Sequence, residues 1–341
     1  MPSCSAAVPP RRRSRSRNWS KWRCAKANAS TRRSSLLSGV ASRRPNPSPP
    51  PCSRPKARPR TARLDSRKGR AMDGPILLVG CGRMGLALLQ GWIDRGVPAD
   101  SITIIEPGRQ ATDAASALGV TVLPEPALIA PGLMPRVVLF AVKPQVMEAV
   151  LPVYRGLVGE RCVVLSIAPG KTLALFERHF GSKTPVVRAM PNTPAAVGKG
   201  MTVLSANKAA SAADRRVSGE LMAAVGEVAW VEDESLMDAV TATSGSGPAY
   251  VFHLIECLAE AAVVAGLPAP LANRLARATV IGSAELAARS DASPATLREN
   301  VTTPGGTTEA ALKVLMGEDG LQRLMTRAIA AASNRSRELA G

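Results

Sequence analysis

The sequence predicts an α/β protein in which an N-terminal doubly wound parallel (Rossmann) sheet is followed by an all-helical region. A short apolar run near residue 76 leads through a glycine-rich turn into a helical pattern. Strand and helix patterns then alternate to about residue 190, which is typical of a parallel sheet with helices on both faces. After Trp230 the apolar periodicity is helical almost without interruption.

The formal net charge of +18 is concentrated in residues 1–71. This segment holds 20 of the 44 Lys and Arg residues but one of the 26 acidic residues, so the rest of the chain, with 24 basic and 25 acidic side chains, is nearly neutral. Segments rich in Arg, Ser and Pro bury too little apolar surface to offset their chain entropy. Residues 1–71 are therefore predicted to be a disordered basic extension.

Three interpretations of this extension remain open. The favoured one is that translation starts at Met72, four residues before the first apolar strand, and that residues 1–71 are upstream sequence. An organelle transit peptide, which is also Arg-rich and acid-poor, comes second. A nucleic-acid-binding arm comes third, because only Trp19 and Trp22 are there to stack on bases.

Length and composition bound the rest of the chain. It is long enough for two domains, which we place at 72–232 for dinucleotide binding and 233–341 for the helices. No apolar run reaches the roughly 18 residues needed to cross a membrane. The two histidines, His179 and His253, are isolated, and the cysteines lack metal-like or disulfide-like spacing. We expect a cytoplasmic protein with no metal site and no membrane or nucleic-acid partner.

The first motif is a strand, a glycine turn and a helix. The predicted strand Ile76–Val79 runs into a turn, and the helical pattern that follows ends at Gly96. The glycines suit a tight turn, close approach to a pyrophosphate and helix–strand packing. The next strand ends at Glu106, 21 residues after the last glycine of the turn, where an acid commonly holds a ribose hydroxyl. The turn residues predicted to bind a dinucleotide are Gly80, Cys81, Gly82, Arg83, Met84 and Gly85.

Two further strands, Val137–Ala141 and Cys162–Ile167, extend the expected sheet. Ligands of such folds bind at the carboxyl ends of the strands. The candidate cofactor residues on these loops are Ala141, Val142, Lys143, Pro144 and Ala168. For Lys143, a solvated side chain at a helix start is the competing interpretation.

The form of the cofactor stays open between NADPH and NADH. The Glu106 carboxylate would repel a 2′-phosphate, which favours NADH. Arg109, three residues further on, could attract that phosphate.

Six helices are expected after Trp230. Their predicted bounds are Leu236–Thr243, Pro248–Ala265, Leu271–Ser290, Pro294–Asn300, Thr307–Met316 and Leu321–Leu339. The string Ser244–Tyr250 joins the first two, and its small residues allow close helix approach or ligand entry. The Ala-rich apolar helices exceed what one small domain can bury alone, which predicts interlocked subunits.

The stretch Asn300–Thr308 places threonine hydroxyls where a new helix begins. Pro304 and the Gly305-Gly306 pair break the preceding helix, and the next helix directs free N–H groups and its positive dipole end at the turn. A small carboxylate would be held there. A plain capping turn explains the residues alone equally well.

Together, the Ser244–Tyr250 string and the Asn300–Thr308 turn resemble the signature of pyrroline-5-carboxylate reductases, and the resemblance extends over residues 75–340. It implies transfer of a hydride from NADPH or NADH to C5 of 1-pyrroline-5-carboxylate, giving L-proline. It also implies an interlocked homodimer, with each active site between one chain's nucleotide domain and helices of the dimer. Rings of such dimers occur in the family.

The resemblance also implies roles for individual residues. Thr308 would hydrogen-bond the ring nitrogen of the substrate, with Thr303 in support. Gly306, Thr307 and Ser246 would bind the substrate. Asn300 and, in the loop Arg188–Pro194, Asn192 would reach the cofactor, although a structural turn explains Asn192 equally well. Glu106 stands where many members carry a small hydroxyl residue, which is a departure from the family pattern.

Two alternatives belong to other functional classes. A β-hydroxyacid dehydrogenase or another imine reductase of the 6-phosphogluconate dehydrogenase superfamily shares the two-domain plan. The dehydrogenases need a lysine on the helix after the interdomain glycines, and Ser246–Ala262 contains none. The second alternative is a non-enzymatic nucleotide- or nucleic-acid-binding protein that uses the basic extension.

Overall fold

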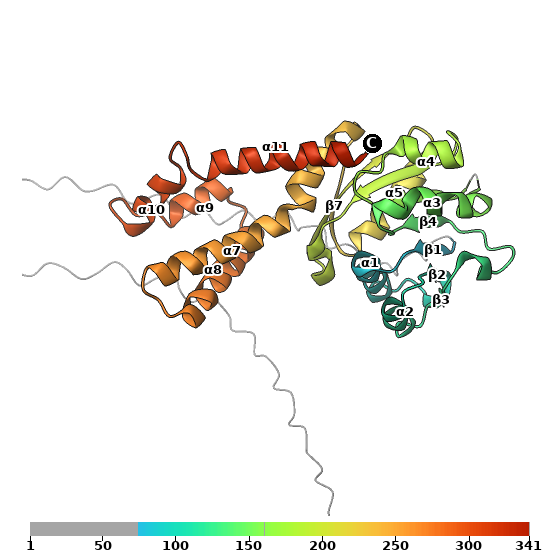
Figure 1. The fold of residues 1–341 in the computed structure, drawn as a ribbon, viewed down its shortest axis with the longest axis horizontal. Coiled ribbons are helices and arrows are strands. Elements are labelled where there is room, and N and C mark those ends of the chain that lie inside the picture. The colour runs from blue at the N-terminus through green and yellow to red at the C-terminus, as the bar shows by residue number, and fades with distance from the viewer. Residues whose placement is uncertain (1–73, 160, 341) are drawn as a thin grey trace, which may run out of the picture. The chain divides into compact units, whose positions relative to one another are not determined.

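A computed structural model describes residues 74–159 and 161–340 of the chain (Figure 1). The predicted basic extension, residues 1–71, and the proposed start at Met72 lie outside the described residues. The described part begins with a mixed sheet and its covering helices and continues as helices alone.

One eight-stranded sheet, in the order β3-β2-β1-β4-β5-β6-β7-β8, forms the first part of the described chain. All neighbouring strands are parallel except β6 and β7, which are antiparallel. The strands are β1 (Ile76–Val79), β2 (Ile102–Ile105), β3 (Thr121–Leu123), β4 (Val137–Phe140), β5 (Val163–Ser166), β6 (Val186–Met190), β7 (Gly200–Ala206) and β8 (Gly226–Trp230). The order of the first six strands is that of a doubly wound sheet, so the predicted fold class is confirmed.

The central strands are apolar because both faces of the sheet are covered. Every residue of β1, β4 and β5 is buried, which explains why all but Ser166 at the end of β5 are apolar. Helices α1 and α5 contribute to the cluster on one face, and α3 and α4 to the cluster on the other. These helices are α1 (Arg83–Asp94), α3 (Met147–Val150), α4 (Leu173–Phe180) and α5 (Ala212–Ala223); α2 (Arg109–Ser116) follows β2.

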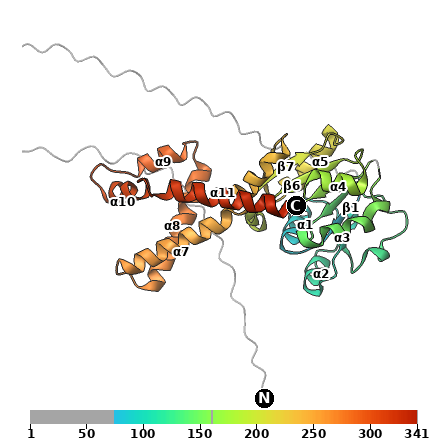
Figure 2. The ribbon, with the colours of Figure 1, turned by 45° about the horizontal axis from the view of Figure 1, so that its top comes forward.

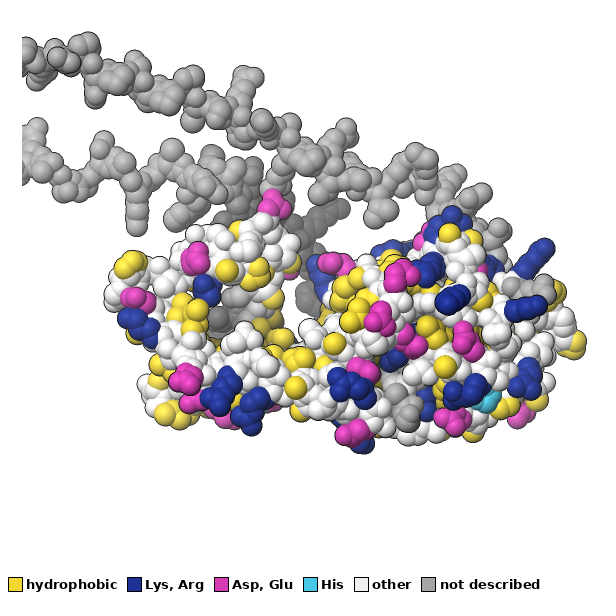
Figure 3. Space-filling model, turned by 90° about the horizontal axis from the view of Figure 1, so that it is seen from above, with side chains coloured by type: hydrophobic (Ala, Val, Ile, Leu, Met, Phe, Trp, Pro, Cys, Tyr) yellow, Lys and Arg dark blue, Asp and Glu magenta, His cyan; other side chains and the backbone are white. Residues whose placement is uncertain are grey.

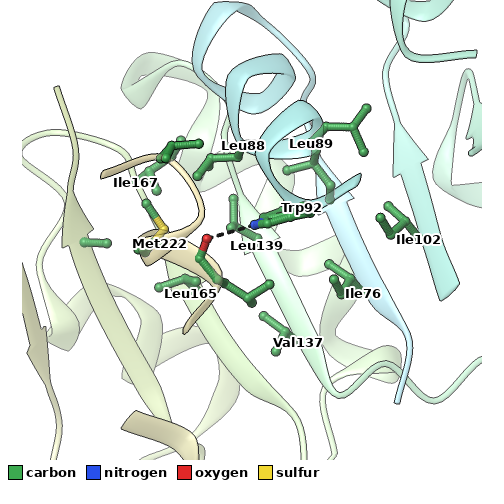
Figure 4. Close-up of a cluster of buried hydrophobic side chains, with 14 of the residues drawn as sticks. Ile76, Leu88, Leu89, Trp92, Ile102, Val137, Leu139, Leu165, Ile167 and Met222 are labelled. Atoms are coloured by element: carbon green, nitrogen blue, oxygen red, sulfur yellow. Dashed lines mark hydrogen bonds between the residues drawn. The ribbon is translucent and has the colours of Figure 1, made fainter. Parts of the chain in front are cut away.

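Trp92 links α1 to α5 through the core (Figure 4). Its ring is fully buried, and its indole N–H donates a 2.9 Å hydrogen bond to the main-chain carbonyl of Leu221. A buried Trp needs such a partner because an unpaired indole N–H would lose its bond to water. The contact therefore holds the two helices in register on one face of the sheet.

The sequence did not identify three strands, β3, β7 and β8. β3 and β8 are the two edges of the sheet and are incompletely buried, so they lack the continuous apolar signal of the central strands. In β7, polar Thr202 and Ser205 are buried, which hides the expected pattern. The segment Arg188–Met190, expected in a loop, continues β6 because Arg188 pairs in register with Ser166 of β5.

The helical part follows the predicted boundaries to within a few residues. Its elements are α6 (Met237–Val240), a π-helical turn (Thr241–Gly245), α7 (Gly247–Val264), α8 (Ala269–Arg289), α9 (Pro294–Asn300), α10 (Thr307–Leu315) and α11 (Leu321–Ala340). The C-terminal end of α11 lies beside α6 (Figures 1 and 2), where the Ser336 hydroxyl donates a 2.6 Å hydrogen bond to Asp238. The domain boundary at 232/233 stays a prediction.

The helices α7 and α8 bury little of their apolar surface within the chain. Their buried residues are Ala259, Ala272 and Ala276, whereas Phe252, for example, is 60% exposed. Figure 3 shows exposed hydrophobic side chains on this helical part, at the left of the view. Other exposed large apolar residues are Val251, Leu254, Leu258, Val263, Val264, Leu271, Leu275, Ile281 and Leu286.

One helical run of the described chain has the length and composition of a membrane-crossing helix. The helical run Glu234–Val264 is long and apolar enough to cross a membrane by length and composition, and 6% of its most apolar window is buried. The sequence count missed this run because polar residues interrupt the apolar string, while the helix continues through them.

Candidate functional site

A cavity of about 630 Å³ lies at the carboxyl ends of β1, β2 and β4. Its walls are mainly apolar, with Glu106 and Lys143 as its charged lining residues. The other lining residues are Val79, Gly80, Gly82, Ile105, Pro107, Ala111, Pro124, Pro126, Ala141, Val142, Val146, Ala149, Val150, Val153 and Tyr154. This is the edge of the sheet where the sequence predicted a dinucleotide.

Each glycine of the turn after β1 is suited to its position for a different structural reason. Gly80 has a φ of +89°, and a Cβ there would lie 3.0 Å from the carbonyl oxygen of Ala141. At Gly85, a Cβ would lie 2.7 Å from the carbonyl oxygen of Gly80, so helix and turn need a glycine to pack. A Cβ on Gly82 would meet no atom within 4 Å, which leaves open space beside the start of α1.

The start of α1 is suited to an anion. The helix has no side-chain cap and no acidic residue in its first turn, so its first N–H groups and its positive dipole end face the turn. Arg83 and Met84 are the first two residues of this helix. A dinucleotide's pyrophosphate fits the open space at Gly82 on these grounds.

Glu106 lines the cavity and is anchored at both carboxylate oxygens. Oε2 accepts a 2.6 Å hydrogen bond from the backbone N–H of Cys81, and Oε1 accepts a 2.7 Å bond from that of Gly108. Burial, and then the nearby Glu106 carboxylate, raise the pKa of the Cys81 thiol to about 11. Cys81 therefore contributes a backbone group to the site, and its thiol stays protonated at neutral pH.

The remaining predicted cofactor residues of the sheet fall into two groups. Ala141, Val142 and Lys143 line the cavity, and Lys143 precedes the short 3-10 turn Pro144–Val146. Ala168 is buried after β5 and does not line this cavity.

Asn192 connects the sheet to the helical part. Its Oδ1 accepts a 2.9 Å hydrogen bond from the backbone N–H of Met201, and its Nδ2 donates a 3.2 Å bond to the Ser244 hydroxyl. Both ends of the amide are thus engaged within the chain. Asn192 lies at the carboxyl end of β6 but does not line the cavity.

A partly buried ion pair that the sequence analysis did not identify lies next to this connection. Arg188 is 4% exposed, and its Nη1 donates a 2.9 Å bond to Oε1 of Glu234. The same carboxylate oxygen accepts a 2.9 Å bond from the backbone N–H of Leu173, the first residue of α4. An Arg within an otherwise apolar strand was the available signal, since a buried charge requires a partner.

The Asn300–Thr308 turn has the shape expected of a helix start. Gly305 has a φ of +71°, and α10 begins after Gly306. The N–H of Gly306 donates a 2.9 Å bond to the carbonyl of Thr303, and that of Gly305 donates a 2.6 Å bond to Glu309 Oε2. These two N–H groups each have an acceptor within the chain, and the assignment of Gly306 to substrate binding stays a prediction.

The hydroxyls of Thr303, Thr307 and Thr308 do not cap a helix, whereas the Thr302 hydroxyl donates a 2.7 Å bond to the carbonyl of Arg298 in α9. Among the residues that the structure describes, no hydrogen bond involves the hydroxyls of Thr303, Thr307 or Thr308, and Gly306 at the N-cap position has no side-chain capping bond. Within the same residues, the N–H groups of Thr307 and Thr308 also have no bonded acceptor. The side-chain contact at this helix start comes from Glu309, which accepts from the N–H of Gly305, while the N–H groups of Thr307 and Thr308 suit a small carboxylate.

The two predicted halves of the site do not share one cavity within a single chain. The lining of the cavity at the sheet comes from residues 79–154, and neither Asn300 nor Thr308 contributes to it. Ser246, at the start of α7, does not line it either.

Comparisons with known proteins agree with both parts of the chain. A family model for pyrroline-5-carboxylate reductase dimerisation matches residues 234–339, and one for coenzyme F420-dependent NADP oxidoreductase matches residues 75–170. A pyrroline-5-carboxylate reductase of Pseudomonas aeruginosa is 41% identical over 266 residues, which cover 78% of this chain and 96% of the relative.

Solved structures of pyrroline-5-carboxylate reductases are also similar to this chain over most of its length. A pyrroline-5-carboxylate reductase from Coxiella burnetii has a TM-score of 0.73 at 35% identity, with 79% of this chain and 99% of that chain covered. A pyrroline carboxylate reductase from Plasmodium falciparum with NADP bound has a TM-score of 0.68 at 27% identity, with 80% and 100% covered.

Proposed function

This chain belongs to the pyrroline-5-carboxylate reductase family, and we propose that it reduces 1-pyrroline-5-carboxylate to L-proline with NADPH or NADH. The observation that carries the proposal is the pairing of a dinucleotide-type cavity with the uncapped Thr307–Thr308 helix start. The 41% identity to a reductase over nearly its whole length supports it. The lack of lysine in α7 disfavours the β-hydroxyacid dehydrogenase alternative.

The cofactor would be held along the carboxyl edge of the sheet. The first N–H groups of α1, with the open space at Gly82, would bind the pyrophosphate, and Glu106 would bind the adenosine ribose. Lys143 and Ala141 would line the path toward the nicotinamide. When bound, the reduced nicotinamide supplies the hydride.

The protein's task at the substrate is positioning and electrostatics. A protonated imine is already electrophilic, so hydride addition at C5 converts the C=N bond to an amine without a proton from the protein. The N–H groups of Thr307 and Thr308 would hold the carboxylate, and the Thr308 hydroxyl would accept from the ring N–H. Thr303, Ser246 and Asn300 would support these contacts. The N–H of Gly305 donates to the Glu309 carboxylate and is not counted among these donors.

We propose a preference for NADH. The Glu106 carboxylate is fixed at the mouth of the glycine turn by two backbone N–H groups, so it would meet a 2′-phosphate as a like charge. The exposed Arg109 side chain, at the first residue of α2, would still attract that phosphate. NADPH would then be used less efficiently rather than excluded.

The active form is proposed to be an interlocked homodimer, which could assemble further into a ring of dimers. The exposed apolar residues of α7 and α8 need a covering partner, and residues 234–339 match a dimerisation model. The same pairing would bring the Asn300–Thr308 turn of one chain to the cofactor cavity of the other, which a single chain does not do. The free thiols of Cys81, Cys162 and Cys257 suit a reducing compartment, and we propose the cytoplasm.

The direct test is oxidation of NADH and NADPH by the purified full chain with 1-pyrroline-5-carboxylate, followed by chromatographic detection of L-proline. The expected result is proline in equal amount to the cofactor oxidised. A Gly82→Asp variant is the control, because its backbone φ of −64° accepts any residue while the new carboxylate would occupy the pyrophosphate space. Reduction of NAD+ or NADP+ by 3-hydroxy acids, with no oxidation of NADH or NADPH by the imine, would overturn the proposal.

A further inference from the structure

The helical run that starts the second part of the chain contains a proline in its interior. Pro248 lies within the run Glu234–Val264, where it has no N–H to donate and its ring would collide with the carbonyl of Ser244 in a regular α-helix. The chain instead widens into the π turn Thr241–Gly245, in which the N–H of Ser246 donates a 2.9 Å bond five residues back to Thr241. Such turns are frequent at functional sites.

The π turn leaves one buried carbonyl without its usual donor. In a regular α-helix, the carbonyl of Ala242 would accept from the N–H of Ser246, which is committed to Thr241 here. The hydroxyl of Tyr250 donates a 3.0 Å bond to this carbonyl instead. Ala242 is fully buried, so its carbonyl would be costly to leave unpaired. Tyr250 therefore fastens the first turn of α7 to the π turn.

The π turn also contacts the edge of the sheet that carries the cofactor cavity. Ser244 accepts the hydrogen bond from Asn192, at the carboxyl end of β6. Gly245 comes so close to the Met190 side chain that a Cβ there would collide with it. Because β6 runs parallel to β5, β4 and β1, these contacts lie at the same edge as Gly80 and Ala141.

We propose that Tyr250 is a positioning residue for hydride transfer, acting by locking the π turn that Pro248 causes. The lock places Ser246 and the start of α7 against the cofactor edge of the sheet through Ser244, Asn192 and Met190. This inference rests on the proposed function, because the lock would maintain the relative position of the nicotinamide and the imine.

Two variants of the full chain test the proposal. Tyr250→Phe removes only the hydroxyl and should lower kcat with 1-pyrroline-5-carboxylate at least about fivefold, because small misplacements of bound reactants are costly. The dissociation constant of the cofactor should stay within about twofold, since Tyr250 does not line the cavity. Hydrogen exchange of peptides from 241–250 should become faster, with peptides from 80–85 unchanged.

Pro248→Ala separates positioning from stability. It restores an N–H that can bond the Ser244 carbonyl, so a regular α-helix becomes available and the free energy of unfolding should stay equal or rise. The value of kcat should nevertheless fall at least as much as in Tyr250→Phe. A merely structural role would predict the reverse, with activity following stability.

Thr184→Val is the matched control. This substitution removes a hydroxyl that donates a 2.8 Å hydrogen bond to the carbonyl of Phe180. Thr184 precedes β6, at the edge of the sheet opposite the cofactor cavity, so kcat should not change. Wild-type kcat in either Tyr250→Phe or Pro248→Ala overturns the inference, and so does an equal loss in Thr184→Val. A wild-type chain that does not reduce the imine overturns the proposed function itself, whereas an active wild type with unaffected variants overturns only the role of Tyr250.

Discussion

The backbone N–H of Cys81 donates a 2.6 Å hydrogen bond to the Glu106 carboxylate, which ties the end of β2 to the glycine turn after β1. The second oxygen of this carboxylate is held by Gly108. A side chain fixed at both oxygens keeps its negative charge at one place in the cavity wall. Its effect on a charged ligand should therefore be large and measurable.

Replacement of Glu106 should change the cofactor preference. Glu106→Ser removes the negative charge that would face the 2′-phosphate of NADPH. Two like charges near 4 Å in a partly exposed site repel by about 4 kcal/mol. Relief of part of this repulsion should raise kcat/KM for NADPH relative to that for NADH by about tenfold or more. Steady-state kinetics with each cofactor measure the ratio. Glu125→Ser is the matched control, because Glu125 follows the next strand but does not line the cavity. An unchanged ratio in Glu106→Ser would mean that this carboxylate does not meet the ribose.

Thr308 should be important for turnover. Thr308→Ala should lower kcat at least about tenfold with nearly unchanged cofactor affinity, because losing one preorganised hydrogen-bonding group costs a few kcal/mol of transition-state stabilisation. Thr303→Ala should cost less, as a supporting contact. Steady-state kinetics and a cofactor titration check both. Full activity of Thr308→Ala would remove this turn from the substrate site.

Two variants that are each impaired should regain activity when they share a dimer. If one chain supplies the cofactor cavity and the other the Asn300–Thr308 turn, a mixed dimer of Gly82→Asp and Thr308→Ala contains one site without any substitution. Co-expressed chains with different affinity tags should then regain about half of the wild-type activity per mixed dimer, as one of two sites is intact. Activity no higher than that of the separate variants would place both halves of the site in the same chain.

The ion pair between Arg188 and Glu234 should contribute to stability. Glu234→Gln leaves the buried Arg188 guanidinium without a charge partner and weakens the hydrogen bond from the Leu173 N–H. The free energy of unfolding should therefore fall by about 1–3 kcal/mol. This is less than the full cost of breaking a buried pair, because the Glu234 side chain is 26% exposed. Urea unfolding measures the change. Glu232→Gln, whose pair with Arg215 is exposed, should have little effect. Equal effects of the two substitutions would contradict a special role of the buried pair.

A chain that begins at Met72 should fold and should reduce the substrate with the same kcat as the full chain. All described elements lie after this residue, with β1 starting at Ile76. Melting temperatures and turnover of the two proteins under equal conditions make the comparison. An insoluble or inactive shorter chain would show that residues 1–71 are structural.

The parts of the fold that the sequence predicted are those with a local physical cause. The runs at β1 and β4, and β5 up to Leu165, are apolar because both faces of the sheet are covered, and Gly96 ends the first helix with a φ of +85°. The edge strands β3 and β8 were missed because their exposed faces impose no continuous apolar run. Strand β7 was missed because its buried residues include polar Thr202 and Ser205, which hide the apolar pattern of a covered strand.

For the candidate site, the sequence by itself determined the glycine turn, the acid after β2 and the threonine turn before α10, since each depends on backbone conformation within a few residues. The tertiary structure alone decided the partners of these groups. The bonds from Cys81 to Glu106, from Arg188 to Glu234 and from Asn192 to Ser244 join residues 25, 46 and 52 positions apart. Side chains so distant in sequence meet only because the parallel sheet aligns the carboxyl ends of its strands and the π turn brings the first helix of the second part against them.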